Sequence, residues 1–253
     1  MRTIVSNAIV VIVGALLAIP AFAAGPVTVT STPVQLTLRG PDLANPGTNL
    51  LIAFAPGLAT TGTIGPLSNT GGSASADFSF AGAAFAISNL NYAIQGQSSL
   101  NNTLAELSAF GVRFTPDVDV TWNLSGSLAW SPGASQSTVA IFNKIIDVTD
   151  FASPVQITLD NHSKSGTSKA VTATVGAALS GGINTTGITG GMLLAGHNYE
   201  WDFDYAVYTG GSGGGPATGG VTLSFTAIPE PAMLSAMAIL AAAAFLRRSR
   251  RFA

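Results

Sequence analysis

Runs in which every second residue is apolar dominate the middle of the chain. The clearest extends from Val118 to Trp130 and the next from Tyr199 to Val207, each with aromatic side chains on one face. Alternation over this length is typical of a β-strand with one buried face. In the first run Gly126 has the parity of the apolar residues, and we expect a bulge or turn there. Both segments are therefore predicted to be strands.

Further short segments are bounded by Gly, Pro, Asn or Ser, which punctuate strands. They are Val27–Thr30, Val34–Leu38, Leu50–Phe54, Ala76–Phe80, Ala84–Ser88, Val155–Leu159, Ala170–Val175 and Val221–Thr226. Many short strands without regularly interspersed helices predict an all-β domain, an antiparallel β-sandwich or jelly roll. The glycine-rich stretch Thr209–Gly220 is predicted to be a flexible hairpin loop before the last strand.

One segment, Thr103–Phe110, has helical spacing. Leu104, Leu107 and Phe110 would share one side of a helix, Thr103 and Glu106 form a capping box, and a glycine follows. We therefore expect one short helix within the β domain.

Both ends of the chain have apolar segments with the features of export signals. Arg2 precedes an apolar stretch from Ile9 to Ile19, and Ala21-Phe22-Ala23 offers the small residues that signal peptidase needs. We predict a signal peptide over residues 1–23, an exported domain over 24–226 and a sorting or anchor segment over 227–253. A first transmembrane helix is the alternative at the N-terminus, but Pro20 and the cleavage site favour a signal peptide.

The C-terminal segment combines three features in a fixed order. Pro229, Glu230 and Pro231 precede an apolar run, Ala232–Leu246, and a basic cluster follows it: Arg247, Arg248, Arg250 and Arg251. At about 1.5 Å per residue the run spans roughly 22 Å, less than the roughly 30 Å of a hydrocarbon core. Such a helix suits a temporary membrane anchor, with its arginines kept inside by the positive-inside rule.

This tail resembles the PEP-CTERM sorting signal of Gram-negative bacteria. The Pro-Glu-Pro triplet, the hydrophobic segment and the arginine cluster match that family in kind and order, over roughly a tenth of the chain. The resemblance implies processing by an inner-membrane exosortase, a transient stay in that membrane, and delivery to the cell surface or medium. It also implies an association with exopolysaccharide and biofilm matrix, but it says nothing about the upstream domain.

The composition of the exported domain limits its partners. Between Ala24 and Ile228 there are five basic and eleven acidic residues, a net charge of −6, and no cysteine occurs anywhere. Nucleic acid is excluded as a partner because phosphate binding requires basic patches. The lack of cysteine excludes thiol catalysis, and the fold must be held by its own core without disulfides. Only 9% of the chain is charged, against about a quarter in an average protein.

Carboxylates provide the candidate metal ligands. Glu200, Asp202 and Asp204 alternate with the aromatic residues of one strand, so they share its other face, and Asp117 and Asp119 are expected to do the same on the second aromatic strand. Were the two strands neighbours, the crowded acids would favour bound Ca²⁺. A solvated outer face is the simpler interpretation. A pair of acids in a glycosidase is a third, which the i, i+2 spacing alone does not discriminate.

Other residues that could carry chemistry lack partners in the sequence. His162 and His197 lie in predicted loops and are expected to be exposed, and Asp147 and Asp150 are expected at a turn or strand end. The chain has three tryptophans that could stack on sugars, but their parity favours the core: Trp122, Trp130 and Trp201. No catalytic set is assembled, so we expect no enzyme activity.

Three functions remain open at this point. The first is an exported, non-enzymatic protein with a structural or interaction role in the surface or biofilm matrix. The second is a carbohydrate-binding module, in which Ca²⁺ could take part. The third is a hydrolase of surface polysaccharide.

Overall fold

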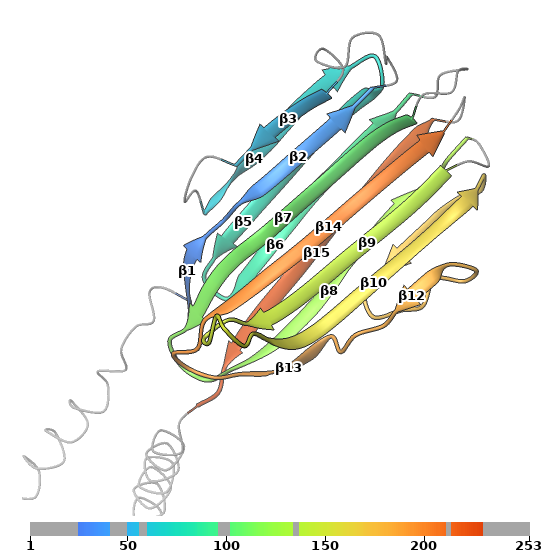
Figure 1. Ribbon diagram of the computed structural model, residues 1–253. Helices are drawn as coiled ribbons and strands as arrows, with labels where there is room; N and C mark the ends of the chain where they lie inside the picture. Colours follow the sequence, from blue (N-terminus) through green and yellow to red (C-terminus); the bar gives the residue numbers. More distant parts are fainter. Residues whose placement is uncertain are drawn as a thin grey trace, which may run out of the picture.

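The computed structural model describes residues 25–40, 50–55, 60–95, 102–133, 137–210 and 214–229. Two antiparallel sheets pack face to face into a β-sandwich (Figure 1). The strands are β1 (Val27–Ser31), β2 (Val34–Arg39), β3 (Leu50–Phe54), β4 (Thr61–Asn69), β5 (Gly72–Ala81), β6 (Ala84–Ile94), β7 (Asn102–Pro116), β8 (Val120–Trp130), β9 (Ser137–Asp147), β10 (Val155–Thr167), β11 (Val171–Thr174), β12 (Ile183–Thr185), β13 (Gly190–Leu193), β14 (Tyr199–Gly210) and β15 (Gly215–Ala227).

Strands far apart in the sequence pair within each sheet. Sheet A has the order β12-β10-β9-β14-β7-β2-β3, with β1 also paired to β7. Sheet B has the order β11-β8-β15-β6-β5-β4, with β13 also paired to β8. The all-β prediction is confirmed, and so is its antiparallel sandwich form. Within the described ranges no helix is long and apolar enough to cross a bilayer.

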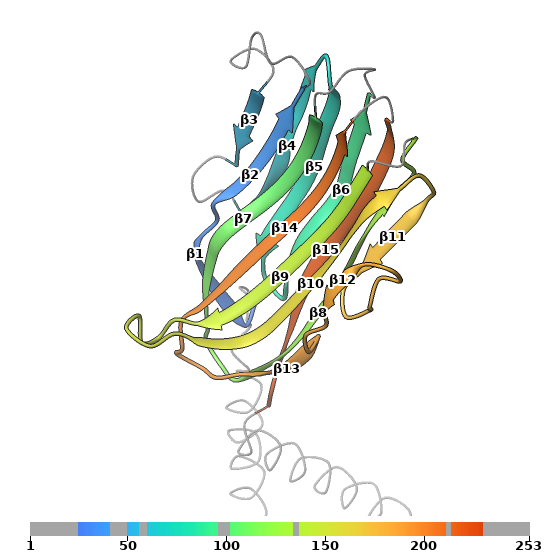
Figure 2. The same ribbon diagram turned by 45° about the vertical axis from the view of Figure 1, so that its right-hand side comes forward.

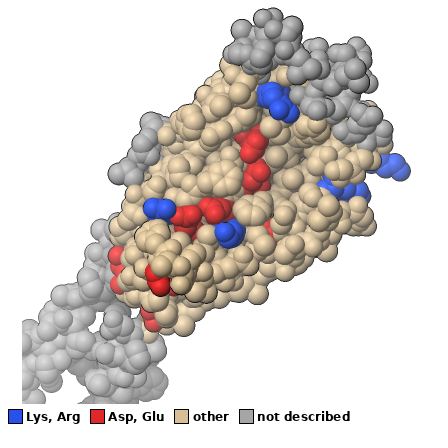
Figure 3. Space-filling model, in the orientation of Figure 1, with Lys and Arg blue, Asp and Glu red and all other residues tan. Residues whose placement is uncertain are grey.

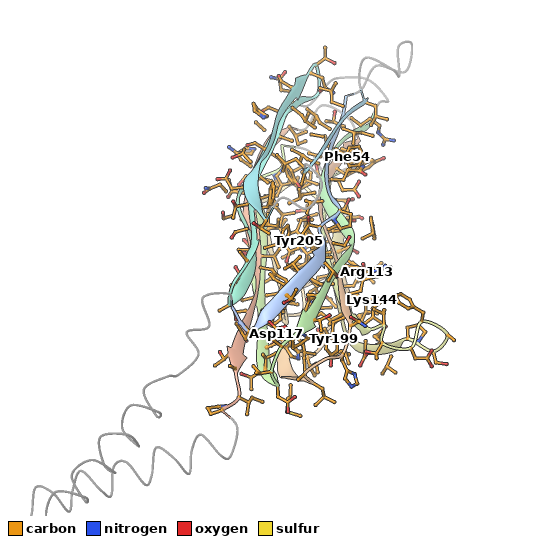
Figure 4. All side chains as sticks on the ribbon, turned by 90° about the vertical axis from the view of Figure 1, so that its left-hand side faces the viewer. Phe54, Arg113, Asp117, Lys144, Tyr199 and Tyr205 are labelled. Atoms are coloured by element: carbon orange, nitrogen blue, oxygen red, sulfur yellow. The ribbon has the colours of Figure 1, made fainter. Side chains whose placement is uncertain are left out.

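The core lies between the sheets and is built from the alternation seen in the sequence. On β14 the inward side chains of Trp201, Phe203 and Tyr205 are fully buried, and Figure 4 shows Tyr205 between the two sheets. Aromatic rings join the sheets, because Phe114 of sheet A lies 5.2 Å from both Phe85 and Phe225 of sheet B, measured between ring centroids. Edge and tilted contacts of this kind add to the stabilisation from buried apolar area.

The predicted helix at Thr103–Phe110 is wrong, since these residues belong to β7. Thr103, Ala105, Leu107 and Ala109 are buried at alternate positions, which is strand periodicity. The small alanines hid this alternation, and the leucines happened to fall at helical spacing as well. Pairing with β14 and β2 on its two sides satisfies the backbone of β7 and overrides the local capping signal.

Two glycine predictions are also corrected. Gly126 causes no bulge, because the register between β8 and β15 is continuous from residue 120 to residue 130. A Cβ at Gly126 would lie 3.0 Å from the Tyr205 hydroxyl and 2.6 Å from the carbonyl oxygen of Gly220, so the residue provides space for sheet packing. The predicted loop Thr209–Gly220 is mostly strand, because β14 extends to Gly210 and β15 begins at Gly215.

The predicted signal peptide lies outside the described residues, as does the predicted sorting segment beyond Pro229. Pro229 itself is exposed just after β15. The predicted domain boundaries therefore stay predictions.

Candidate functional site

The inner face of β10 is polar, and it binds the segment that follows β11, which includes the short strand β12. We call residues 176–188, between β11 and β13, the strap. Asp160 is fully buried, and its carboxylate accepts hydrogen bonds from the backbone N–H groups of Gly176 and Gly187, at 3.1 and 3.2 Å. Its Oδ1 also lies 3.0 Å from Nε2 of His162. These bonds give partners to the N–H groups of two partly buried glycines and tie the largely exposed strap to β10.

The prediction of two exposed loop histidines is wrong for His162. This residue lies on β10 with no exposed surface, and its Nδ1 is 2.9 Å from Oδ1 of Asn184 in the strap. His197 lies in the connection before β14, as predicted, where its Nδ1 is 2.8 Å from Oδ2 of Asp147. Asp147 is the last residue of β9 and Asp150 lies in the following turn, which confirms their predicted positions.

The hydrogen bonds of Asp147 affect its pKa more than its partial burial does. Burial acts to raise the pKa of this carboxyl, but bonds from Thr149 and His197 favour the charged form, and the net effect is a lowered pKa. The contact between Asp147 and His197 joins the end of β9 to the connection before β14. These contacts account for both residues structurally.

The three tryptophans belong to the core, as their parity predicted. The exposed fraction is 3% for Trp122, 1% for Trp130 and zero for Trp201. None of them is available for stacking on a sugar. Replacement of Trp201 would therefore alter the core and is no test of ligand binding.

Three of the five predicted carboxylates share one face of the structure, and the other two lie elsewhere. Glu200, Asp202 and Asp204 share the outer face of β14 in sheet A. Asp117 and Asp119 lie in the connection between β7 and β8, so their expected place on the second aromatic strand is wrong. That strand, β8, belongs to sheet B and cannot be the neighbour of β14.

We define the acidic face as the outer surface of β7, β14 and β9 that carries four acids and two bases. Its charged members are Glu106, Glu200, Asp202, Asp204, Arg113 and Lys144. Figure 3 shows the acidic side chains over the middle of this surface with basic side chains around them. In Figure 4 Arg113 and Lys144 are on the outer side of sheet A. The contribution of β7 was missed because its segment was predicted to be a helix.

At the lower end of the acidic face, each carboxylate has a partner. Arg113 Nε donates to Glu200 Oε2 at 2.8 Å, and the guanidinium also lies 5.3 Å from the ring centroid of Phe151. Asp202 accepts a 2.7 Å bond from the backbone N–H of Gly111, a residue with φ of +89° at a bulge opposite β14. Burial raises the pKa of Asp202 even though this bond opposes the shift.

At the upper end, the acids Asp204 and Glu106 lie near each other and are less well compensated by hydrogen bonds and opposite charges. Burial, and then the charge of Glu106, raise the pKa of Asp204 to about 7. Burial likewise raises the pKa of Glu106, against the opposing charge of Arg39 and a hydrogen bond from Ser108. One oxygen of Asp204, Oδ1, is shielded from solvent and has no hydrogen-bond partner in the described part of the chain.

Aromatic rings border this upper end. Phe142 of β9 is directly opposite Asp204 in the register and is partly exposed on the same face. Tyr208 of β14 is partly exposed two outward positions beyond Asp204 along the face. A carboxyl beside accessible rings can hydrogen-bond hydroxyl groups while the rings cover apolar C–H surface.

The outer face of sheet B differs in chemistry. Its outward positions on β5, β8 and β15 carry mainly hydroxyl and amide side chains, and the charged residue among them is Asp77. Asp77 accepts hydrogen bonds from Asn89 at 2.7 Å and Thr63 at 2.6 Å. These bonds lower its pKa. Both oxygens of the Asp77 carboxylate therefore have hydrogen-bond partners, in contrast to Oδ1 of Asp204.

Metal binding by the predicted triad gains no support from this geometry. Among the described residues no three acids or histidines are placed to hold a metal ion together. Glu200 faces Arg113 and Asp202 binds a backbone N–H group, so two of the three carboxylates are already engaged. Ca²⁺ at these residues stays a prediction.

Comparison with known proteins identifies no family. No protein-family model matches the chain, and no curated protein matches it either. Among solved structures, it is similar to the family 11 carbohydrate-binding module of the cellulosomal cellulase Lic26A-Cel5E of Clostridium thermocellum, with 12% identity and a TM-score of 0.25 over 69% of this chain and 93% of that one. A family 11 carbohydrate-binding module from Clostridium thermocellum in complex with a β-1,3-1,4-mixed-linked tetrasaccharide gives 13% identity and a TM-score of 0.22, over 69% of this chain and 94% of that one.

A viral protein is similar to a comparable degree. The structure of infectious bursal disease virus Gx strain matches with 12% identity and a TM-score of 0.21, over 82% of this chain and 62% of that chain. Scores this low do not establish a common fold, and neither ligand nor activity follows from them.

Proposed function

We propose that this protein is exported and acts as a non-catalytic component of the cell-surface matrix that binds polysaccharide through the acidic face. The signal peptide over residues 1–23 and the PEP-CTERM-like tail from Pro229 support export and exosortase processing. The acidic face supplies the chemistry for contact with a hydroxyl-rich polymer. The observation that carries the binding site is the position of Asp204, a mostly buried carboxyl of raised pKa directly opposite the partly exposed ring of Phe142, with Tyr208 further along the same face.

Sugar recognition needs the combination found at the upper end of this face. A carboxyl of pKa about 7 is partly protonated at neutral pH and can both donate to and accept from a sugar hydroxyl. The neighbouring rings provide the flat apolar surface on which pyranose C–H groups pack. The sandwich holds these side chains on paired strands, so the surface is organised before a ligand arrives.

Phe142→Ala is expected to weaken polysaccharide binding about tenfold, because loss of the ring removes roughly 1.4 kcal/mol of contact. The full-length chain, purified in detergent, would be tested for co-sedimentation with polysaccharide extracted from the host culture. The matched control is Asp77→Asn, which changes an acid on the outer face of sheet B and should bind as well as wild type. Equal binding by wild type and Phe142→Ala, with both folded, would contradict the assignment of the site.

The same preparation distinguishes the alternatives. Release of reducing ends from the polysaccharide would indicate a hydrolase and overturn the non-catalytic proposal. Folded protein that binds no polysaccharide would leave a purely structural role in the matrix. Export is tested separately by mass spectrometry of protein recovered from cells and medium, where the mature form should begin at Ala24 and lack the arginine cluster. Intact chain in the cytosol would contradict export.

A further inference from the structure

Strand β3 is the edge of sheet A, and it carries apolar side chains toward solvent. Leu50, Ile52 and Phe54 have exposed fractions of 43%, 44% and 66%, and all three share the outer face of the sheet. The strand contains no charged residue and no proline. Figure 2 shows β3 at the margin of the sandwich, with β2 as its neighbour.

The backbone of β3 has a free side with a definite pattern. The N–H group of Ala55 donates to the carbonyl oxygen of Val34 at 3.0 Å, which fixes the parity of the antiparallel ladder. Residues at this parity, Ala53 and Leu51, direct their backbone groups toward β2. Ile52, with Leu50 and Phe54 on either side, therefore directs its N–H and C=O groups away from the sheet.

Other edge strands carry features that discourage pairing. On β4, Pro66 lies in an irregularity between Ile64 and Leu67, and β1 has a register shift between Val29 and Ser31. The short edge strands β11, β12 and β13 have three or four residues each, and β10 binds the strap beside β12. Short, irregular or proline-containing edges are common means of preventing sheet extension. In the described part of the chain β3 stands out as an unprotected edge.

The geometry points to a second copy of this chain as the partner of β3, through antiparallel pairing about a two-fold axis at Ile52. In this register Ile52 faces its own copy, and Leu50 of each copy faces Phe54 of the other. All three residues have outward backbone groups, so each facing pair exchanges two hydrogen bonds. The six side chains then form one continuous apolar strip on the joined outer face.

Self-complementarity favours a second copy over an unrelated strand. The same three residues supply both halves of the ladder and of the apolar strip, with no charge left opposite an apolar group. Joining two A sheets in this way also places two acidic faces on one continuous surface. A polymeric ligand would then meet two binding sites together, which increases avidity.

Cysteine cross-linking tests this contact directly, because the natural chain contains no cysteine. In the proposed register the two Ile52 Cα atoms would be about 5.5 Å apart, within the range that a disulfide spans. Full-length Ile52→Cys in detergent is expected to form covalent dimers under mild oxidation. The matched control is Phe110→Cys, which replaces a side chain 65% exposed on β7, away from β3, and should form no covalent dimer.

A second variant separates loss of association from loss of folding. Ile52→Pro removes an outward N–H group that makes no bond to β2, so the sandwich should fold while the non-covalent dimer is lost. Light scattering is expected to show twice the chain mass for wild type and a single chain mass for Ile52→Pro, with unchanged circular dichroism. A monomeric wild type would overturn the proposal, as would cross-linking of Ile52→Cys no faster than Phe110→Cys. A cross-linked product containing a different protein would also overturn it.

Discussion

Asp204→Asn is expected to stabilise the protein at pH 8 by about 2 to 4 kcal/mol and to change little below pH 4. Burial, and then the charge of Glu106, raise the pKa of Asp204 from 3.8 to about 7 in the folded protein. Between these values the folded state holds a proton that the unfolded chain has released. The free energy of unfolding of wild type therefore falls as the pH rises through this window, and it stays low above it.

Thermal unfolding as a function of pH measures this effect. Asparagine has the shape of a protonated aspartate and cannot ionise, so the variant should lose this part of the pH dependence. The gain at pH 8 corresponds to a rise in Tm of roughly 4 to 16 °C for a domain of this size. Asp77→Asn is the control, because hydrogen bonds from Asn89 and Thr63 lower the pKa of Asp77. Its replacement should destabilise at pH 8, the opposite sign. Parallel pH profiles for wild type and Asp204→Asn would contradict the account.

Asp160→Ala is expected to destabilise the protein by about 3 to 5 kcal/mol, since it leaves buried groups without an acceptor. The side chains and backbone groups affected are Nε2 of His162 and the N–H groups of Gly176 and Gly187. Hydrogen exchange should become faster across the strap before it does so in β14, because the strap depends on this carboxylate. Denaturant unfolding supplies the change in free energy.

The control for this change is Asp150→Ala, which removes an acid from the turn after β9. Asp150 is exposed and accepts a hydrogen bond from the backbone N–H of Ala152 at 3.0 Å. Its replacement should lower the free energy of unfolding by no more than about 1 kcal/mol. If Asp160→Ala were as stable as Asp150→Ala, the strap would be held by other contacts.

Alternation was sufficient to predict the strands whose inward residues are large. The inward residues Trp201, Phe203 and Tyr205 of β14 identify the buried face directly, and the acids on the opposite face follow from the pleat. In β7 the inward positions include Ala105 and Ala109, which carry too little hydrophobic signal to outweigh the helical spacing of the leucines. Small inward residues therefore concealed the strand that completes the acidic face.

Partners distant in the sequence were beyond prediction from local patterns. His162 was placed in a loop because it has polar neighbours, but those neighbours bind the strap, which follows in the chain after β11. Glu106 and Asp204 meet through the pairing of β7 with β14, some hundred residues apart in sequence. Their raised pKa values depend on this proximity and on burial, neither of which a single sequence specifies.

The central claim is that polysaccharide contacts the acidic face of sheet A. Hydrogen–deuterium exchange of the full-length chain, with and without polysaccharide from the host culture, tests this most directly. We predict slower exchange in β7, β9 and β14 around Phe142 and Asp204, with β5 and β8 of sheet B unchanged. Protection confined to sheet B, or no protection at saturating polysaccharide, would contradict the account.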